Sequence, residues 1–130
     1  MNIPEELRYT EDHEWVRLIE GEEGMVLVGI TDYAQSELGD LVYVELDADL
    51  GDSLGKKEIF GSVEAVKTTS DLFMPISGEI VDFNAALEDA PETINEDVYG
   101  EGWIIKIKLS NPDEIAELLD AAQYHEAIAG

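Results

Sequence analysis

The chain has 130 residues, with 31 acidic residues against seven lysines and arginines, and a formal net charge of -24 at pH 7. This charge repels phosphate backbones and anionic headgroups, which argues against nucleic-acid and membrane-surface binding. The absence of cysteine excludes disulfides, thiol nucleophiles and zinc-thiolate sites. Because 45% of the residues are hydrophobic, we expect residues 1–130 to form a single domain with a real core.

The beginning of the chain has neither a basic region nor an apolar stretch of signal-peptide length, and no run approaches a membrane span. We therefore expect a cytoplasmic protein, with residues 1–6 as a loose N-terminal extension. The acidic excess also fits a protein that works in high salt, where screening weakens the repulsion between its own charges.

The pattern of apolar and β-branched residues predicts a mostly antiparallel β-domain with short helices. Strands are expected over residues 15–19, 25–30, 41–46, 58–66, 72–74, 79–83 and 103–109. A helix is expected to begin at Thr31 and to end before Gly39. Residues 49–56 and 84–101 have the composition of turns and loops. The tail, residues 111–129, is predicted to form two short helices, because Asn111 and Asp120 each begin a capping-box pattern.

Lys67 is the most informative residue of the chain. It lies between two predicted strands, and no other lysine or arginine occurs between Lys57 and Lys106. The polar residues 68–71 that follow it favour a turn. The pattern predicts a single exposed amine at a hairpin tip, which a modifying enzyme could reach; an ordinary solvated lysine is the alternative.

Several motifs, in order from about Leu7 to Tyr124, closely resemble the H-protein family of the glycine cleavage system. They are Tyr9–Val16, Val28–Gln35, Leu38–Asp40, Gly61–Lys67, Pro75–Ile80, Asn95–Tyr99 and Gly102–Ile107. The resemblance implies a mainly β fold, a flattened barrel-sandwich hybrid of the biotinyl/lipoyl carrier type with a C-terminal helical tail. It also implies that Lys67 carries lipoic acid in amide linkage.

The resemblance implies a carrier and not an enzyme. Its lipoyl-lysine arm would take the aminomethyl group of glycine from a pyridoxal-phosphate glycine decarboxylase to a tetrahydrofolate-dependent aminomethyltransferase. A dihydrolipoyl dehydrogenase would then reoxidise the arm, and a lipoate-attaching enzyme would have installed it. We expect the carrier to be monomeric. The residues agree with this role, since they show no nucleophile-base pair, and the two histidines lack metal-ligand spacing.

In the family, the loaded arm folds into a cleft where acidic and hydroxyl groups hold the cationic amine. By resemblance, Glu14 and Asp71 match such positions, and a carboxylate is a sensible partner for an ammonium group. Asp12 stands where some members have serine, which would strengthen the negative field. Tyr33 stands where some members have histidine, so a role that depends on that imidazole cannot be transferred.

Three alternative functions remain open at this stage. A lipoate relay to other lipoyl domains would use the same Lys67. A biotin carrier would share the hairpin, but biotinylated lysines usually lie between methionines, whereas Val66 and Thr68 flank Lys67. A plain acidic interaction domain would use no modification at all.

Overall fold

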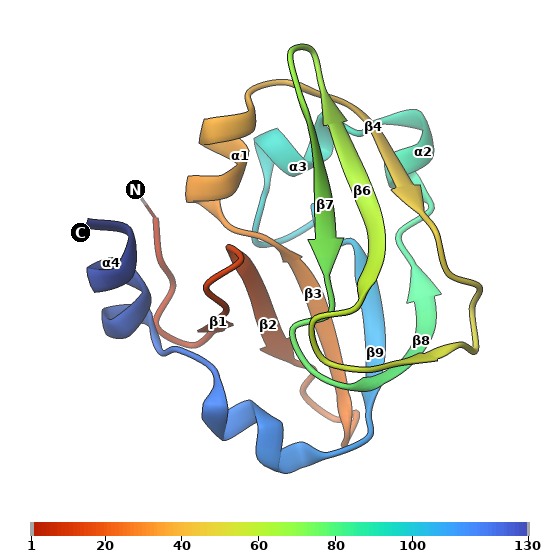
Figure 1. The fold of residues 1–130 in the computed structure, drawn as a ribbon, viewed down its shortest axis with the longest axis vertical. Coiled ribbons are helices and arrows are strands. Elements are labelled where there is room, and N and C mark those ends of the chain that lie inside the picture. The colour runs from red at the N-terminus through yellow and green to blue at the C-terminus, as the bar shows by residue number, and fades with distance from the viewer. Residues whose placement is uncertain (1, 130) are drawn as a thin grey trace.

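The chain folds into two antiparallel sheets, and the computed structural model describes residues 2–129 (Figure 1). Within these residues, the larger sheet has six strands in the spatial order β1 (Arg8–Tyr9), β2 (Glu14–Leu18), β3 (Met25–Ile30), β9 (Ile105–Leu109), β8 (Gly78–Phe83) and β5 (Ser53–Leu54). The smaller sheet of the described chain has three, in the order β4 (Leu41–Leu46), β6 (Ile59–Ala65) and β7 (Thr69–Phe73). The predicted antiparallel β-domain is confirmed.

The strand predictions are correct for β3 and β4 and within two residues for most of the others. The sequence does not predict β5, because a two-residue strand in a turn-rich connection shows no periodicity. The strand after Lys67 begins at Thr69, not at Leu72 as predicted. Ser70 and Asp71 are therefore strand residues, and the turn after Lys67 is shorter than expected.

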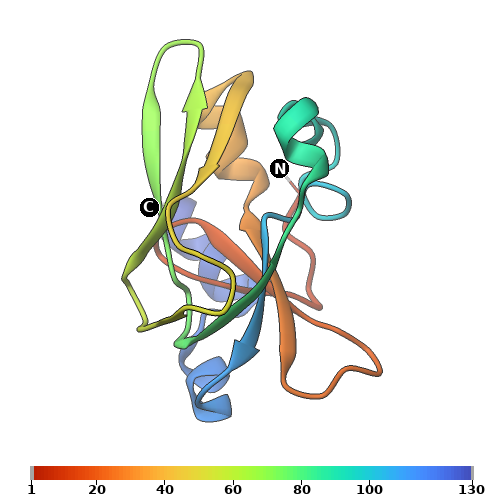
Figure 2. The same ribbon diagram turned by 90° about the vertical axis from the view of Figure 1, so that its right-hand side faces the viewer.

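The main core lies between the two sheets, which Figure 2 shows from the side. Strands of both sheets direct apolar side chains into it, as expected where one face of a sheet is buried. Fully buried members include Phe60, Met74, Ile76, Ile80, Ile105 and Ile107. This core fixes the base of the β6–β7 hairpin, whose tip reaches the end of the molecule in both views (Figures 1 and 2).

Helix α1 (Asp32–Leu38) confirms the predicted helix after β3. The Thr31 hydroxyl caps it by accepting a hydrogen bond from the Ala34 N–H at 3.2 Å. Gly39 ends the helix at a φ of 82°, a left-handed conformation that glycine adopts without steric cost. This helix forms one side of the candidate site.

The prediction of continuous loop over residues 84–101 is wrong in two places. Helices α2 (Ala86–Asp89) and α3 (Thr93–Glu96) lie there, each anchored by one buried apolar residue, Leu87 and Ile94. A four-residue helix is too short to show helical periodicity, so the many acidic residues of this segment dominate its sequence pattern.

The tail forms the two predicted helices, the 3₁₀ helix η1 (Pro112–Glu117) and α4 (Ala121–Ala129). The capping box at Asp120 is confirmed, because Asp120 and Gln123 exchange backbone-to-side-chain hydrogen bonds of 2.9 and 2.8 Å. The capping box at Asn111 is only half formed. Its Glu114 carboxylate instead accepts hydrogen bonds from the N–H and hydroxyl of Ser77, at 2.7 and 3.0 Å.

A second, smaller core joins α4 and the beginning of the chain to the outer side of β1 and β2. The Tyr124 ring stacks on the Tyr9 ring with centroids 4.8 Å apart. In the segment that precedes β1, the Asn2 N–H donates to Asp32 and the Asn2 carbonyl accepts from the Tyr99 hydroxyl. Residues near both ends of the chain thus pack beside α1.

None of the helices in the described part of the chain is both long enough and apolar enough to cross a membrane.

Candidate functional site

Lys67 lies in a two-residue turn at the tip of the β6–β7 hairpin. The Ala65 N–H donates to the Thr68 carbonyl at 2.7 Å, which closes the turn around Val66 and Lys67. All residues from Val66 to Thr69 are exposed. The predicted exposed amine at a hairpin tip is confirmed, in a tighter turn than the polar residues suggest.

The other lysines are placed differently. Lys56, Lys57 and Lys106 each form ion pairs with carboxylates at 2.6 to 3.3 Å. Lys108 lies within strand β9, where its backbone pairs with both neighbouring strands. Among the residues the structure describes, Lys67 is therefore the one lysine at a projecting tip without an ion pair.

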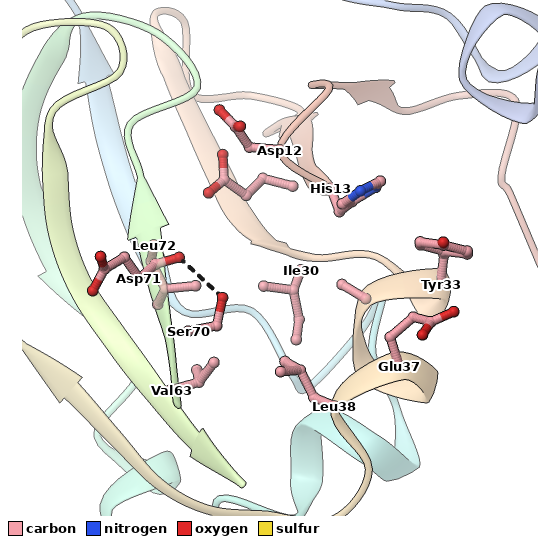
Figure 3. Close-up of a pocket in the computed structure, with 12 residues that line it drawn as sticks. Asp12, His13, Ile30, Tyr33, Glu37, Leu38, Val63, Ser70, Asp71 and Leu72 are labelled. Carbon is pink, nitrogen blue, oxygen red and sulfur yellow. Dashed lines mark hydrogen bonds between the residues drawn. The ribbon is translucent and has the colours of Figure 1, made fainter. Parts of the chain in front are cut away.

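A cleft of about 310 Å³ lies between the sheets, α1 and the turn before β2 (Figure 3). Its floor is apolar and its rim is polar, a common design for sites that hold small organic groups. The apolar side chains are Ile30, Ala34, Leu38, Val63 and Leu72, and the polar ones are Asp12, His13, Glu14, Tyr33, Glu37, Ser70 and Asp71.

Glu14 is the most deeply buried of the predicted acidic residues, with only 2% of its surface exposed. Its carboxylate accepts a hydrogen bond of 2.8 Å from the Phe73 N–H and one of 3.3 Å from the Thr10 hydroxyl. Burial raises the pKa of Glu14 to about 8, although these hydrogen bonds act in the opposite direction. The side chain therefore links β2 to β7 and holds a proton at neutral pH.

Asp12 lines the cleft, and its carboxylate forms an ion pair with the Lys57 amine at 3.0 Å. Lys57 also contacts Glu11 at 3.3 Å. Because this cation neutralises part of its charge, Asp12 contributes less negative field to the cleft than its sequence position suggests. The pair is partly exposed, so solvent weakens the attraction further.

Asp71 borders the cleft, but its carboxylate points away from it. In the sheet register Asp71 pairs with Ser62, and Ser62 pairs with Glu45. The neighbouring row has Ser70 opposite Val63, which is fully buried and therefore marks the inner face. Since side chains alternate along a strand, Asp71 lies on the outer face. Figure 3 shows its carboxylate on the opposite side of β7 from the Ser70 hydroxyl.

His13 forms one wall of the cleft, and the sequence does not single it out. Its backbone has a φ of 68°, and its ring lies 4.9 Å from the Tyr33 ring. Its Nδ1 is 2.8 Å from the hydroxyl of Tyr124, which is in turn 2.7 Å from the Thr31 hydroxyl. A residue of the C-terminal helix therefore holds both the turn at His13 and the start of α1.

The donors and acceptors in this chain of hydrogen bonds can be assigned by starting at Thr31, its buried end. Thr31 Oγ1 already accepts from the Ala34 N–H, so its own hydrogen needs an acceptor, and the Tyr124 oxygen is in reach. With the Thr31 hydrogen donated in this direction, the Tyr124 hydrogen donates to His13 Nδ1, and Nδ1 carries no proton. Burial also lowers the pKa of His13, so both effects favour the neutral ring with its proton on Nε2.

Comparisons with known proteins place this geometry in context. The chain matches the model of the family described as glycine cleavage H-protein over residues 7–130. It is 57% identical to the glycine cleavage system H protein of Chlorobium luteolum over 130 residues, which is 100% of both chains. It is 55% identical to that of Salinibacter ruber, over 97% of this chain and 98% of the relative. A crystal structure of a glycine cleavage system H protein from Mycobacterium marinum matches with a TM-score of 0.88 and 41% identity, covering 98% of this chain and 100% of that one.

Proposed function

Because the chain belongs to the glycine cleavage H-protein family, we propose that Lys67 is the residue that carries its lipoic acid. The family membership and the structural match confirm the predicted carrier fold. The protein is a lipoyl carrier of the glycine cleavage system, not a catalyst. Its partners are glycine decarboxylase, aminomethyltransferase and dihydrolipoyl dehydrogenase. When attached, the lipoyl group supplies a dithiolane that accepts a one-carbon amine cargo.

The observation that carries the proposal is the position of Lys67. A two-residue turn presents its amine beyond the end of both strands, and neighbouring residues are exposed. An enzyme can therefore reach the amine without opening the fold, and a lysine on a flexible four-carbon stem can turn in several directions. The other described lysines are placed differently: Lys56, Lys57 and Lys106 are held in ion pairs, and Lys108, although exposed, lies within strand β9 and not at a turn.

We propose that the cleft beside α1 receives the arm when its cargo is protected from water. Its apolar floor fits a hydrocarbon chain, and the carboxyl groups of Glu14 and Asp12 that line it fit a cationic amine. A cation beside Glu14 would lower the raised pKa of that carboxyl, so cargo binding and release of the Glu14 proton would be coupled. Because Asp71 lies on the outer face of β7, its carboxylate would attract the cationic amine outside the cleft, as the arm approaches.

Intact-mass spectrometry after incubation with a lipoate-attaching enzyme tests the attachment site. We expect one lipoyl increment on the wild type and none on Lys67→Arg, with Lys108→Arg as the matched control that keeps the increment. An increment that persists in Lys67→Arg contradicts the proposal.

We also propose that residues 1–130 act as one carrier domain in the cytoplasm, as a monomer. The family match over residues 7–130 supports a single domain, and the bacterial relatives support the compartment. Size-exclusion chromatography with light scattering at physiological and high salt measures the oligomeric state. A dimer mass in both conditions contradicts the monomer.

A further inference from the structure

Three exposed apolar side chains lie next to the Lys67 tip. Val66 is 71% exposed, Tyr43 51% and Val42 47%. Most apolar residues of the described chain lie in the two cores or are packed against them. Leu18, Leu50 and Ile59 are similarly exposed, but they lie away from the tip end of the smaller sheet, where this group gathers. We call these three residues the tip patch.

The strand register places the tip patch at the tip end of the smaller sheet. Tyr43 pairs with Glu64, three residues before Lys67, and the Val66 N–H donates to the Asp40 carbonyl at 3.3 Å. Val42 lies at a β-bulge in β4, where the register shifts between Leu41 and Tyr43. Since a strand rises about 3.4 Å per residue, Tyr43 lies roughly 10 Å from Lys67 along the strand.

Carboxylates border the tip patch on the outer face of the sheet. Glu64 lies opposite Tyr43, while Glu45 and Asp71 occupy the next row with Ser62 between them. Each of these three acids is exposed, and none forms an ion pair among the described residues. A partner that covers this face must bring an apolar contact surface edged with basic side chains.

The distance between the turn and the reacting group decides which partner must touch the tip patch. An enzyme that modifies the bare amine has to bring its reacting carbon within one lysine side chain of the turn. An enzyme that acts on the dithiolane meets it at the far end of a much longer arm. The contact with Val66 and its neighbours is therefore obligatory only for the first kind of enzyme.

We propose that the tip patch is the docking surface of the lipoate-attaching enzyme, which presents an apolar surface edged with lysine or arginine. This inference rests on the proposed lipoylation of Lys67. In the reaction the Lys67 ammonium gives up a proton and its nitrogen attacks the carbonyl carbon of an activated lipoyl donor. The amide bond forms, and the bond to the donor's leaving group breaks, with the electron pair departing on that group.

Rates of lipoylation measured by intact-mass spectrometry test this assignment. We expect Val66→Ser and Tyr43→Ser each to lower kcat/KM for lipoylation roughly tenfold, mainly through KM, because a central apolar contact is lost. The matched control is Leu18→Ser, a residue 63% exposed at the end of β2 in the other sheet, and its rate should not change. Val66→Thr, which keeps the shape and replaces one methyl with a hydroxyl, should show a smaller loss.

A second assay separates this proposal from docking by other partners. Each variant is lipoylated to completion, and the reduction of its lipoyl disulfide by dihydrolipoyl dehydrogenase, run in reverse with a reduced nicotinamide cofactor as electron donor, is measured. The proposal predicts wild-type rates in this assay and a lipoylation rate that falls as salt rises.

Two results contradict the docking assignment. Unchanged lipoylation of both serine variants overturns it, and so does a loss confined to the dehydrogenase assay, which would assign the patch to that enzyme. A wild-type protein that takes no lipoyl group would instead contradict the proposed function itself.

Discussion

Two turns near the candidate site connect antiparallel strands, and they are held in opposite ways. The turn at Lys67 is closed by one hydrogen bond between Ala65 and Thr68, and its side chains are exposed. The turn before β2 is held by side chains, both its own and those of distant residues such as Tyr124, whose hydroxyl lies 2.8 Å from His13 Nδ1. The Thr10 hydroxyl accepts from the N–H groups of Asp12 and Glu14, both at 3.2 Å.

This difference suits the two tasks proposed for these sites. A carrier lysine must leave the protein surface to reach its partners, so few contacts should hold its turn. A cleft that shields a cargo must keep its shape, so the turn that forms its wall is tied to β7 through Glu14 and to α4 through His13. The turn beside the cleft is therefore held by many contacts, and the turn that presents the Lys67 amine by few.

The largest effect should come from the pH dependence that Glu14 creates at the end of the buried turn. Its pKa is about 8 in the fold against 4.5 for an unperturbed glutamate. Between these values the native state holds a proton that the unfolded state has lost, so stability falls as pH rises. The free energy of unfolding should decrease by about 1.4 kcal/mol per pH unit at the steepest point, and level off above pH 8.

Glu14→Gln isolates this contribution from the other carboxylates. Urea unfolding from pH 4.5 to pH 9 should give a flatter profile for the variant than for the wild type. Parallel profiles would show that Glu14 ionises in the fold near its ordinary pKa. The Glu14 carboxyl carbon, followed by NMR, gives the same pKa directly.

A matched pair of threonines compares the two turns themselves. Thr10→Val leaves two backbone N–H groups and the Glu14 carboxyl without their hydroxyl partner, which should cost about 2 kcal/mol of unfolding free energy. Thr68→Val at the exposed turn should change stability by less than about 0.5 kcal/mol. Equal losses in urea unfolding would contradict the contrast between the turns.

The exposed turn could be predicted from the sequence because its signal is local. An isolated Lys67 between two apolar strands and before polar residues is visible in one short window. The error concerned Ser70 and Asp71, whose turn propensity was overridden by pairing with β6. That error also hid the outward direction of Asp71, because the face of a strand residue depends on register.

The buried turn could be predicted only in part. The resemblance predicts Glu14 and Asp12 as cleft residues, but the Lys57 partner of Asp12 lies 45 residues away in the sequence. The contact between His13 and Tyr124 spans 111 residues. A histidine and a tyrosine that far apart leave no pattern in one sequence, so only the fold brings them together.

Tyr124→Phe tests that long-range contact with a smaller expected effect. Removing the hydroxyl leaves His13 Nδ1 and the hydroxyl hydrogen of Thr31 without a partner, while the Ala34 N–H still donates to Thr31 Oγ1. This loss should cost about 1 kcal/mol. The nitrogen-15 shifts of the His13 ring should also change, because the hydrogen bond that selects its tautomer is lost. Tyr9→Phe is the matched control, since it removes a buried-ring hydroxyl that binds only the Pro4 carbonyl. Loss of the Tyr9 hydroxyl should leave the nitrogen-15 shifts of His13 unchanged. The same shift change in both variants would mean that it comes from a general loosening of the second core.

The smallest expected effect on folding is at Lys67 itself. Its side chain forms no ion pair within the described residues, so Lys67→Arg should change the free energy of unfolding by less than about 0.5 kcal/mol. The same variant should lose all lipoylation, because the guanidinium does not replace the amine. A clear loss of stability in urea unfolding would mean that the turn depends on this side chain. The exposed turn would then be a structural element and not only a support for the arm.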